Sequence, residues 1–93
     1  MIAYQRFIAE DGRSIEMGLG ATGIVAERLP ALAQRLDAKQ GTFEAWECQQ
    51  IAKVLNDVLA LGRDDDDEKA AELAHLVQFF HRSGRVTMTQ VVT

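Results

Sequence analysis

The sequence has little of what stabilises secreted proteins or carries a chain across a membrane. It holds a single cysteine, Cys48, so an intrachain disulfide framework is excluded. No apolar run approaches the roughly 18–20 residues that span a bilayer, and residues 1–10 lack the basic and then apolar order of a secretory signal. We therefore expect a protein of the reducing cytoplasm with no membrane partner.

Basic residues are too few and too scattered for a surface that binds nucleic acid directly. The chain carries 10 Lys and Arg against 14 Asp and Glu, a net charge of −4, and none of the segments 1–38, 39–62 and 63–93 is net basic. Because nucleic-acid binders concentrate positive charge on one surface, we expect no direct nucleic-acid partner. An acidic protein can instead dock on a basic surface of another protein.

The remaining composition is that of an ordinary small globular domain. Hydrophobic residues make up 47% and charged residues 26% of the chain, which argues against wholesale disorder and fibrous repeats. We expect residues 1–93 to form one domain, because domains typically run about 100–150 residues. A chain of this size buries only roughly 60–65% of its unfolded surface, so a partner or a homodimer would add to its stability. The usage of Ala, Leu and Arg indicates a bacterial or phage origin.

Residues 1–20 predict a β-hairpin. The second arm alternates strictly between apolar and small or polar residues, as a half-buried strand does. Asp11-Gly12 favours a two-residue type I′ turn, which places Ile8 opposite Ile15. The predicted core face comprises Ile2, Tyr4, Ile8, Ile15, Met17 and Leu19, with Arg6 as its one charged member.

The choice of loop length decides which face of the first arm is buried. With the two-residue loop, Phe7 falls on the face opposite the predicted core. A three-residue loop would shift the register by one residue and reverse the faces of that arm. We prefer the two-residue loop because it pairs Ile8 with Ile15 rather than with Ser14.

Helical spacing of apolar residues predicts three helices, over residues 24–38, 43–61 and 65–82. Pro30 conflicts with a continuous first helix, because proline removes a backbone hydrogen bond and clashes past the first turn. Either this helix kinks near Leu29 or it begins at Pro30. The expected N-caps of the first and second helices are Thr22 and Thr42.

The last segment, residues 85–93, is rich in Val and Thr and predicts a strand on which Val86 and Met88 share a face. The element order is therefore ββαααβ. The simplest closed arrangement is an α+β fold in one small domain, with a three-stranded antiparallel sheet and helices packed on one face.

One glycine-rich stretch, Gly18 to Gly23, matches the pattern G-x-G-x-x-G between a predicted strand and a predicted helix. In dinucleotide-binding proteins such glycines let a pyrophosphate approach a helix N-terminus. The rest of that unit is missing, since another helix begins where its second parallel strand should follow. We interpret the stretch as a flexible connection that uses positive φ, and keep nucleotide or phosphate binding as an alternative.

A run of five acidic residues is the most conspicuous local feature. One or two carboxylates at a helix start would cap free N–H groups and complement the helix dipole. The surplus suggests a docking patch for a basic partner surface. The residues of the run are Asp64, Asp65, Asp66, Asp67 and Glu68.

Two aromatic residues lie off the predicted apolar stripes, Phe7 in the hairpin and Trp46 near the first turn of the second helix. Aromatic side chains are enriched at protein interfaces because they supply large, rigid contact area. They belong to the predicted partner-binding surface if both are exposed. If Phe7 packs under the last strand and Trp46 against the edge of the helices, they are structural.

No pattern of reactive side chains indicates catalysis or a metal. His75 and His81 are six residues apart, about 240° around a helix, and neither has a Cys or His at metal-ligand spacing. Cys48 lies on an apolar stripe, where a buried, unreactive thiol is the usual state. We expect no enzyme, no metal and no cofactor.

The sequence therefore predicts a non-enzymatic, acidic protein-binding module, a regulator or inhibitor that occupies a partner's surface. One version covers the basic groove of a nucleic-acid-binding protein, as an anti-restriction, anti-CRISPR or immunity-type protein would. The alternative is a self-associating structural or scaffold protein, paired through a C-terminal edge strand. The second alternative is the small nucleotide or phosphate binder.

Overall fold

The computed structural model describes residues 3–38, 40–61 and 67–92. Within these residues the chain forms four strands and four helices. They are β1 (Ala3–Ala9), β2 (Ser14–Met17), α1 (Leu19–Arg28), α2 (Pro30–Ala38), β3 (Gly41–Phe43), α3 (Ala45–Leu61), α4 (Asp67–Arg82) and β4 (Val86–Val92).

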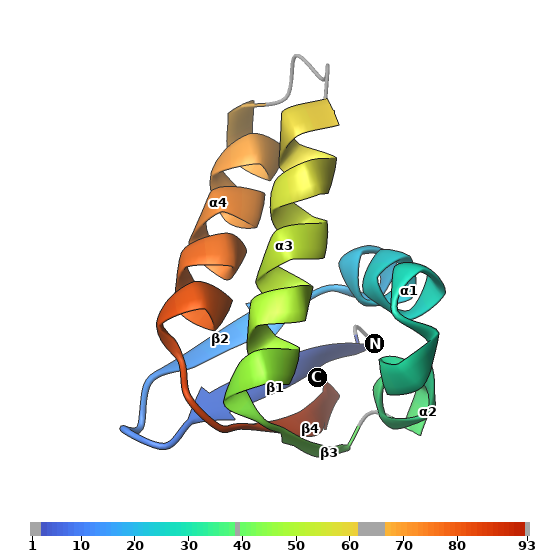
Figure 1. The fold of residues 1–93 in the computed structure, drawn as a ribbon, viewed down its shortest axis with the longest axis vertical. Coiled ribbons are helices and arrows are strands. Elements are labelled where there is room, and N and C mark those ends of the chain that lie inside the picture. The colour runs from blue at the N-terminus through green and yellow to red at the C-terminus, as the bar shows by residue number, and fades with distance from the viewer. Residues whose placement is uncertain (1–2, 39, 62–66, 93) are drawn as a thin grey trace.

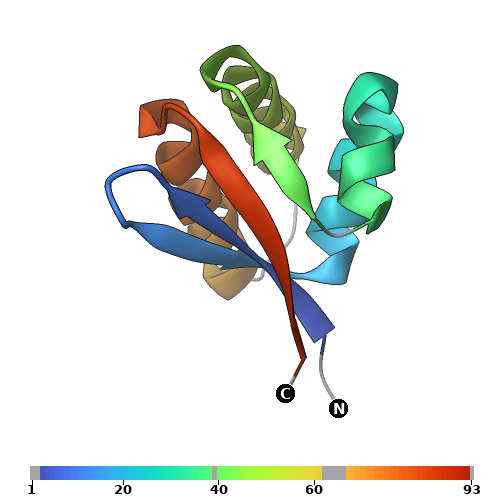
Figure 2. The same cartoon turned by 90° about the horizontal axis from the view of Figure 1, so that it is seen from below.

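The strands form one antiparallel sheet in the order β2-β1-β4-β3, so β1 and β4 are central. The helices lie on one face of the sheet, with α3 and α4 as an antiparallel pair, α2 beside β3, and α1 next to α2 and α3 (Figures 1 and 2). The predicted α+β fold is confirmed. The predicted number of three strands is wrong, because the short β3 adds a fourth along β4 and displaces β4 from the edge.

Strand β3 occupies the place where the sequence analysis put a helix cap. Thr42 lies in β3 opposite Thr87, and the Glu44 carbonyl accepts the first helical hydrogen bond, from the Cys48 N–H at 2.9 Å. Glu47 Oε1 accepts a hydrogen bond from the Glu44 N–H at 2.9 Å. This is the side-chain half of a capping box, so Thr42 as N-cap is a wrong prediction.

The hairpin between β1 and β2 has a three-residue loop, not the two-residue loop that we preferred. The Ala9 N–H donates to the Arg13 carbonyl at 2.8 Å, and the Gly12 N–H donates to the Ala9 carbonyl at 3.0 Å. Gly12 has φ 92°, the left-handed position that follows a type I turn in such loops. The Asp11 carboxylate also accepts from the Arg13 N–H at 3.0 Å, which stabilises this turn.

The longer loop reverses the faces of β1. Phe7 pairs with Ile15, and Ile8 pairs with Ser14. Phe7 is fully buried, whereas Ile8 is 38% exposed, so the predicted register was wrong and Phe7 is a core residue. Of the predicted core face, Ile2 and the side chains of Tyr4 and Leu19 lie outside the described part of the structure.

The core joins the inner face of the sheet to the helices. The Phe7 ring lies edge-on to Phe80 of α4, with 5.0 Å between ring centroids, and 6.1 Å from Phe43 of β3. Val86 and Met88 are both buried, which confirms that they share a face of β4. Phe7 therefore sits where β1, β3 and α4 meet.

Pro30 divides the predicted first helix into two. Leu29 between them is outside the helical region, with φ −124° and ψ 75°, because a following proline disfavours the helical conformation. Pro30 then starts α2, a position where its missing N–H costs nothing. Thr22 is not an N-cap. It lies inside α1, where its buried hydroxyl is 2.7 Å from Gln5 Oε1 and 2.9 Å from the Gly18 carbonyl.

A pair of truncations tests the observed register. We expect Phe7→Ala to lower the free energy of unfolding by about 3–5 kcal/mol, because it leaves a cavity among packed rings. Ile8→Ala removes a half-exposed side chain and should cost much less. Urea unfolding measures both changes. If Ile8→Ala proved the more damaging, the two-residue loop would be correct after all.

Candidate docking surface

The first candidate surface is a hollow between α1, α3 and α4. It has a volume of about 370 Å³, and apolar side chains and glycines form most of its wall. Its lining residues are Gly18, Gly20, Ala21, Ile24, Val58, Glu72, Leu73 and Leu76. An apolar hollow of this kind can accept a side chain from a partner.

One large apolar side chain that lines this hollow is exposed, and another is exposed one helical turn beyond it on α3. Ile24 on α1 lines it and is 37% exposed, and Leu61 at the end of α3 is 68% exposed. Leu61 follows the lining residue Val58 by three positions, so the two are neighbours on one helix face. Val58 and Leu61 both fit the helical spacing of apolar residues that predicts the helix over residues 43–61, a pattern that normally indicates core residues. This helix has more apolar positions than one buried face needs, and that surplus was the one sign in the sequence that some of them are exposed.

One charged side chain, that of Glu72, lines the hollow, and it is acidic. The predicted acidic patch joins α3 to α4 in the sequence, directly after Leu61, Gly62 and Arg63. Asp64, Asp65 and Asp66 lie outside the described residues, as do the side chains of Asp67 and Glu68, although α4 begins at Asp67.

The predicted pairing of Phe7 with Trp46 in one surface is not formed. Phe7 is fully buried, whereas Trp46 is 62% exposed in the first turn of α3. Trp46 and Leu61 are fifteen residues apart, which is about 22 Å along a helix. Trp46 therefore belongs to a different surface from the hollow.

The stretch Gly18 to Gly23 is helical rather than a flexible connection. Gly18 is the N-cap of α1 with φ −72°, and Gly20 and Gly23 lie within α1. Among the described glycines, positive φ occurs only at Gly12 and Gly41, so our interpretation of a loop using positive φ was wrong. No side chain caps the α1 N-terminus, but Glu72 in the same hollow would repel an anion there.

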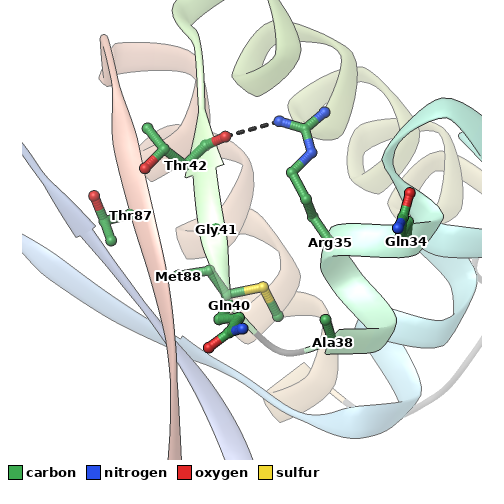
Figure 3. A pocket seen from close by; sticks show the side chains of 8 residues that line it. All are labelled: Gln34, Arg35, Ala38, Gln40, Gly41, Thr42, Thr87 and Met88. Atoms are coloured by element: carbon green, nitrogen blue, oxygen red, sulfur yellow. Dashed lines mark hydrogen bonds between the residues drawn. The ribbon is translucent and has the colours of Figure 1, made fainter.

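A tight polar cluster fastens α2 to β3 and α3. The Arg35 guanidinium contacts both carboxylate oxygens of Glu47, with Nη1 3.1 Å from Oε1. Nη1 also donates to the Thr42 carbonyl at 2.7 Å (Figure 3), and the guanidinium lies 4.8 Å from the centroid of the Phe43 ring. All of these donors are engaged within the fold, so we interpret the cluster as structural.

The electrostatics of the cluster agree with this role. The hydrogen bonds from Arg35 lower the pKa of Glu47 below its usual value, and the same contacts raise the pKa of Arg35. Burial, with the nearby Glu47 and Glu44 charges, raises the pKa of Cys48 to about 11. The Cys48 thiol is fully buried and therefore stays protonated near neutral pH, which disfavours a nucleophilic role.

The histidines do not converge. His81 Nδ1 is 3.1 Å from Gln49 Oε1, and its carbonyl accepts from Gln49 Nε2 at 2.8 Å, while His75 is exposed elsewhere on α4. Within the described ranges, no three His, Cys, Asp or Glu side chains gather closely enough to hold a metal ion. Nor does any helix there combine the length and apolar character needed to cross a membrane.

Comparison with known proteins gives no relative. No family model, curated protein or solved structure matches this chain. The surfaces must therefore be interpreted from their own chemistry.

Replacing Glu47 tests the polar cluster. A carboxylate whose pKa is lowered by folding stabilises the fold above its unfolded pKa of about 4.3, and this stabilisation is lost as the pH falls through the folded value. We expect Glu47→Gln to cost about 1–3 kcal/mol near neutral pH, and the difference from wild type to shrink below pH about 4.

Urea unfolding across this pH range measures the effect. Glu16→Gln is the matched control, because the Arg6–Glu16 ion pair lies on the surface with side chains 40% and 52% exposed. Exposed pairs contribute little. Equal, pH-independent losses in the two variants would contradict a special role for Glu47.

Proposed function

We propose that this chain is a non-enzymatic protein-binding module, a regulator or inhibitor that works by occupying a surface of a partner protein. The observation that carries the proposal is the apolar hollow between α1, α3 and α4, which the half-exposed Ile24 lines. Leu61, also exposed, lies one helical turn beyond the lining residue Val58. Apolar grooves and patches at a protein surface often mark sites of interaction with another molecule.

The shape of the hollow favours an anchor side chain from the partner. Its walls come from three helices and include Ile24, Val58 and Leu73. Binding energy at protein interfaces concentrates on a few large side chains that fill such pockets while the surroundings exclude water. A partner would therefore insert one or two apolar side chains here.

The charge around the hollow favours a basic partner. Glu72 lines it, and Asp64 to Glu68 follow closely after Leu61 in the sequence. Acidic groups around an apolar anchor site attract a Lys- or Arg-rich surface, which speeds association and selects the partner. A basic groove that otherwise binds nucleic acid is one surface of this kind, so an anti-restriction, anti-CRISPR or immunity-type protein remains one version of the proposal.

The test is capture of a partner from source-cell lysate, followed by titration with the purified partner. We expect Ile24→Asp with Leu61→Asp to weaken binding about tenfold or more, because both changes place charge where apolar contact forms. Replacing Asp64 to Asp67 by Asn and Glu68 by Gln should weaken binding mainly at low salt, since salt screens exposed charges.

Trp46→Ala is the matched control, because it removes an exposed aromatic side chain from the distant end of α3. Binding should survive this change, and far-ultraviolet circular dichroism should show that every variant folds. Equal binding by wild type and the Ile24/Leu61 variant would overturn the proposed site. Loss of binding with Trp46→Ala instead would move the site to the first turn of α3.

A further inference from the structure

The central strand β4 pairs with β1 along its whole length on one side, but with β3 along only its first half on the other side. β1 pairs with β4 over its whole length, from Val86 to Val92. On the other side β3 pairs only with Val86, Thr87 and Met88. Within the described residues, Thr89 to Val92 therefore have no strand beside them on the β3 side. The predicted C-terminal edge strand therefore lies between two strands in its first half, and it is an edge strand only in its second half.

The hairpin fixes which backbone groups face this open side. Ala9 directs its N–H towards β2, because it donates to the Arg13 carbonyl. Successive residues of a strand alternate in direction, so Arg6 and Tyr4 direct their backbone groups towards β4. Their partners Thr89 and Val91 then face β1. Gln90 and Val92, which alternate with them, direct N–H and C=O groups outwards.

A hollow adjoins the start of this edge. It has a volume of about 510 Å³ and lies where β3 begins, between α2 and β4 (Figure 3). Gln34 and Ala38 of α2 form one side of it, and Thr87 and Met88 of β4 form the other. Thr87 and Met88 are the last two residues of β4 before its open half, and none of the described side chains among Thr89 to Val92 lines the hollow. The hollow therefore marks the place beside β3 where the open half of β4 begins.

The edge also lacks the features that usually prevent strand pairing. β4 contains no charged residue and no proline, whereas proteins commonly protect an open edge with Lys, Pro or a bulge. The other long edge differs, because β2 carries Glu16 in an ion pair with Arg6. The open half of β4 is thus the less protected edge.

We propose that a second copy of this chain pairs antiparallel with the open half of β4, about a two-fold axis at Val91. This register places Gln90 opposite Val92 of the second copy, and Val92 opposite Gln90 of the second copy. Both are hydrogen-bonded pairs, so all the outward backbone groups of these two residues find partners. The same surface serves both copies, as a two-fold interface requires.

The register fits the rest of the sheet. Gly41 of β3 pairs with Met88, two positions before Gln90, so the paired stretch stays clear of β3. Two copies with a net charge of −4 each repel one another. This repulsion opposes strand pairing only weakly, because β4 itself carries no charge. This interface is separate from the hollow between α1, α3 and α4 and does not depend on the proposed function.

A cysteine at position 91 tests the register directly. In the proposed dimer, position 91 lies opposite its own copy in a non-hydrogen-bonded pair, with about 4.5 Å between Cα atoms, within disulfide range. Val91→Cys should therefore form a disulfide-linked dimer on mild oxidation. Thr89→Cys is the matched control, because its copies would lie about 13 Å apart. Cys48 is fully buried and can stay in place.

Sedimentation velocity from micromolar to millimolar concentration measures the dimer without cross-linking. We expect a concentration-dependent dimer in the wild type and in Gln90→Ala, which keeps the backbone N–H. Gln90→Pro loses this outward N–H and should stay monomeric, while its β1–β4 hydrogen bonds remain. Should Gln90→Pro fold poorly, Gln90→Lys replaces it, since two added charges near the axis repel.

Three results would overturn the proposal. One is a wild type that stays monomeric throughout, which would leave the edge to an extended segment of another protein. Another is a dimer that persists undiminished in both Gln90→Pro and Gln90→Lys. The third is equal cross-linking of Val91→Cys and Thr89→Cys.

Discussion

The three-residue turn at Gly12 is the constraint on which most of this structure depends. Gly12 adopts φ 92°, and the turn sets β1 against β2 with Phe7 opposite Ile15. Phe7 then packs against Phe43 and Phe80 and links the sheet to α4. The same turn directs alternate backbone groups of β1 towards β4 and so leaves Gln90 facing the open edge. One glycine thereby determines both the core and the unpaired part of the sheet.

A second constraint acts where β3 begins. Arg35 hydrogen-bonds both the Glu47 carboxylate and the Thr42 carbonyl. The chain between α2 and α3 therefore passes close to the aliphatic part of the Arg35 side chain. A Cβ at Gly41 would lie 3.1 Å from Arg35 Cγ, and Gly41 has φ 137°. Glycine therefore fits this entry into β3 better than any other residue. β3 begins at this glycine and ends at Phe43, and it pairs with only the first three residues of β4.

The sequence predicted those elements whose pattern is local. The helices α3 and α4 and the shared face of Val86 and Met88 follow from periodicity alone. Pro30 indicated a break in the first predicted helix but left open whether the helix kinks or starts there. The hairpin register did not follow, because Asp11-Gly12 suits both loop lengths and only packing against Phe43 and Phe80 distinguishes them. β3 was missed because three residues carry no periodicity. Ile24 and Leu61 look like core residues until the arrangement of α1 shows what it leaves uncovered.

The hollow and the open edge share no lining or pairing residue, so one chain can use both. A dimer paired about Val91 would carry two hollows, one on each copy, related by the two-fold axis. If a partner presents two basic sites that both hollows of the dimer can reach, binding at the first site makes binding at the second intramolecular. The overall affinity then rises although each hollow binds its site no more tightly than before. A single small domain with few anchor side chains would thereby gain affinity from its own symmetry. In that arrangement, loss of the β4 pairing would weaken binding to a two-site partner and leave binding to one isolated site unchanged.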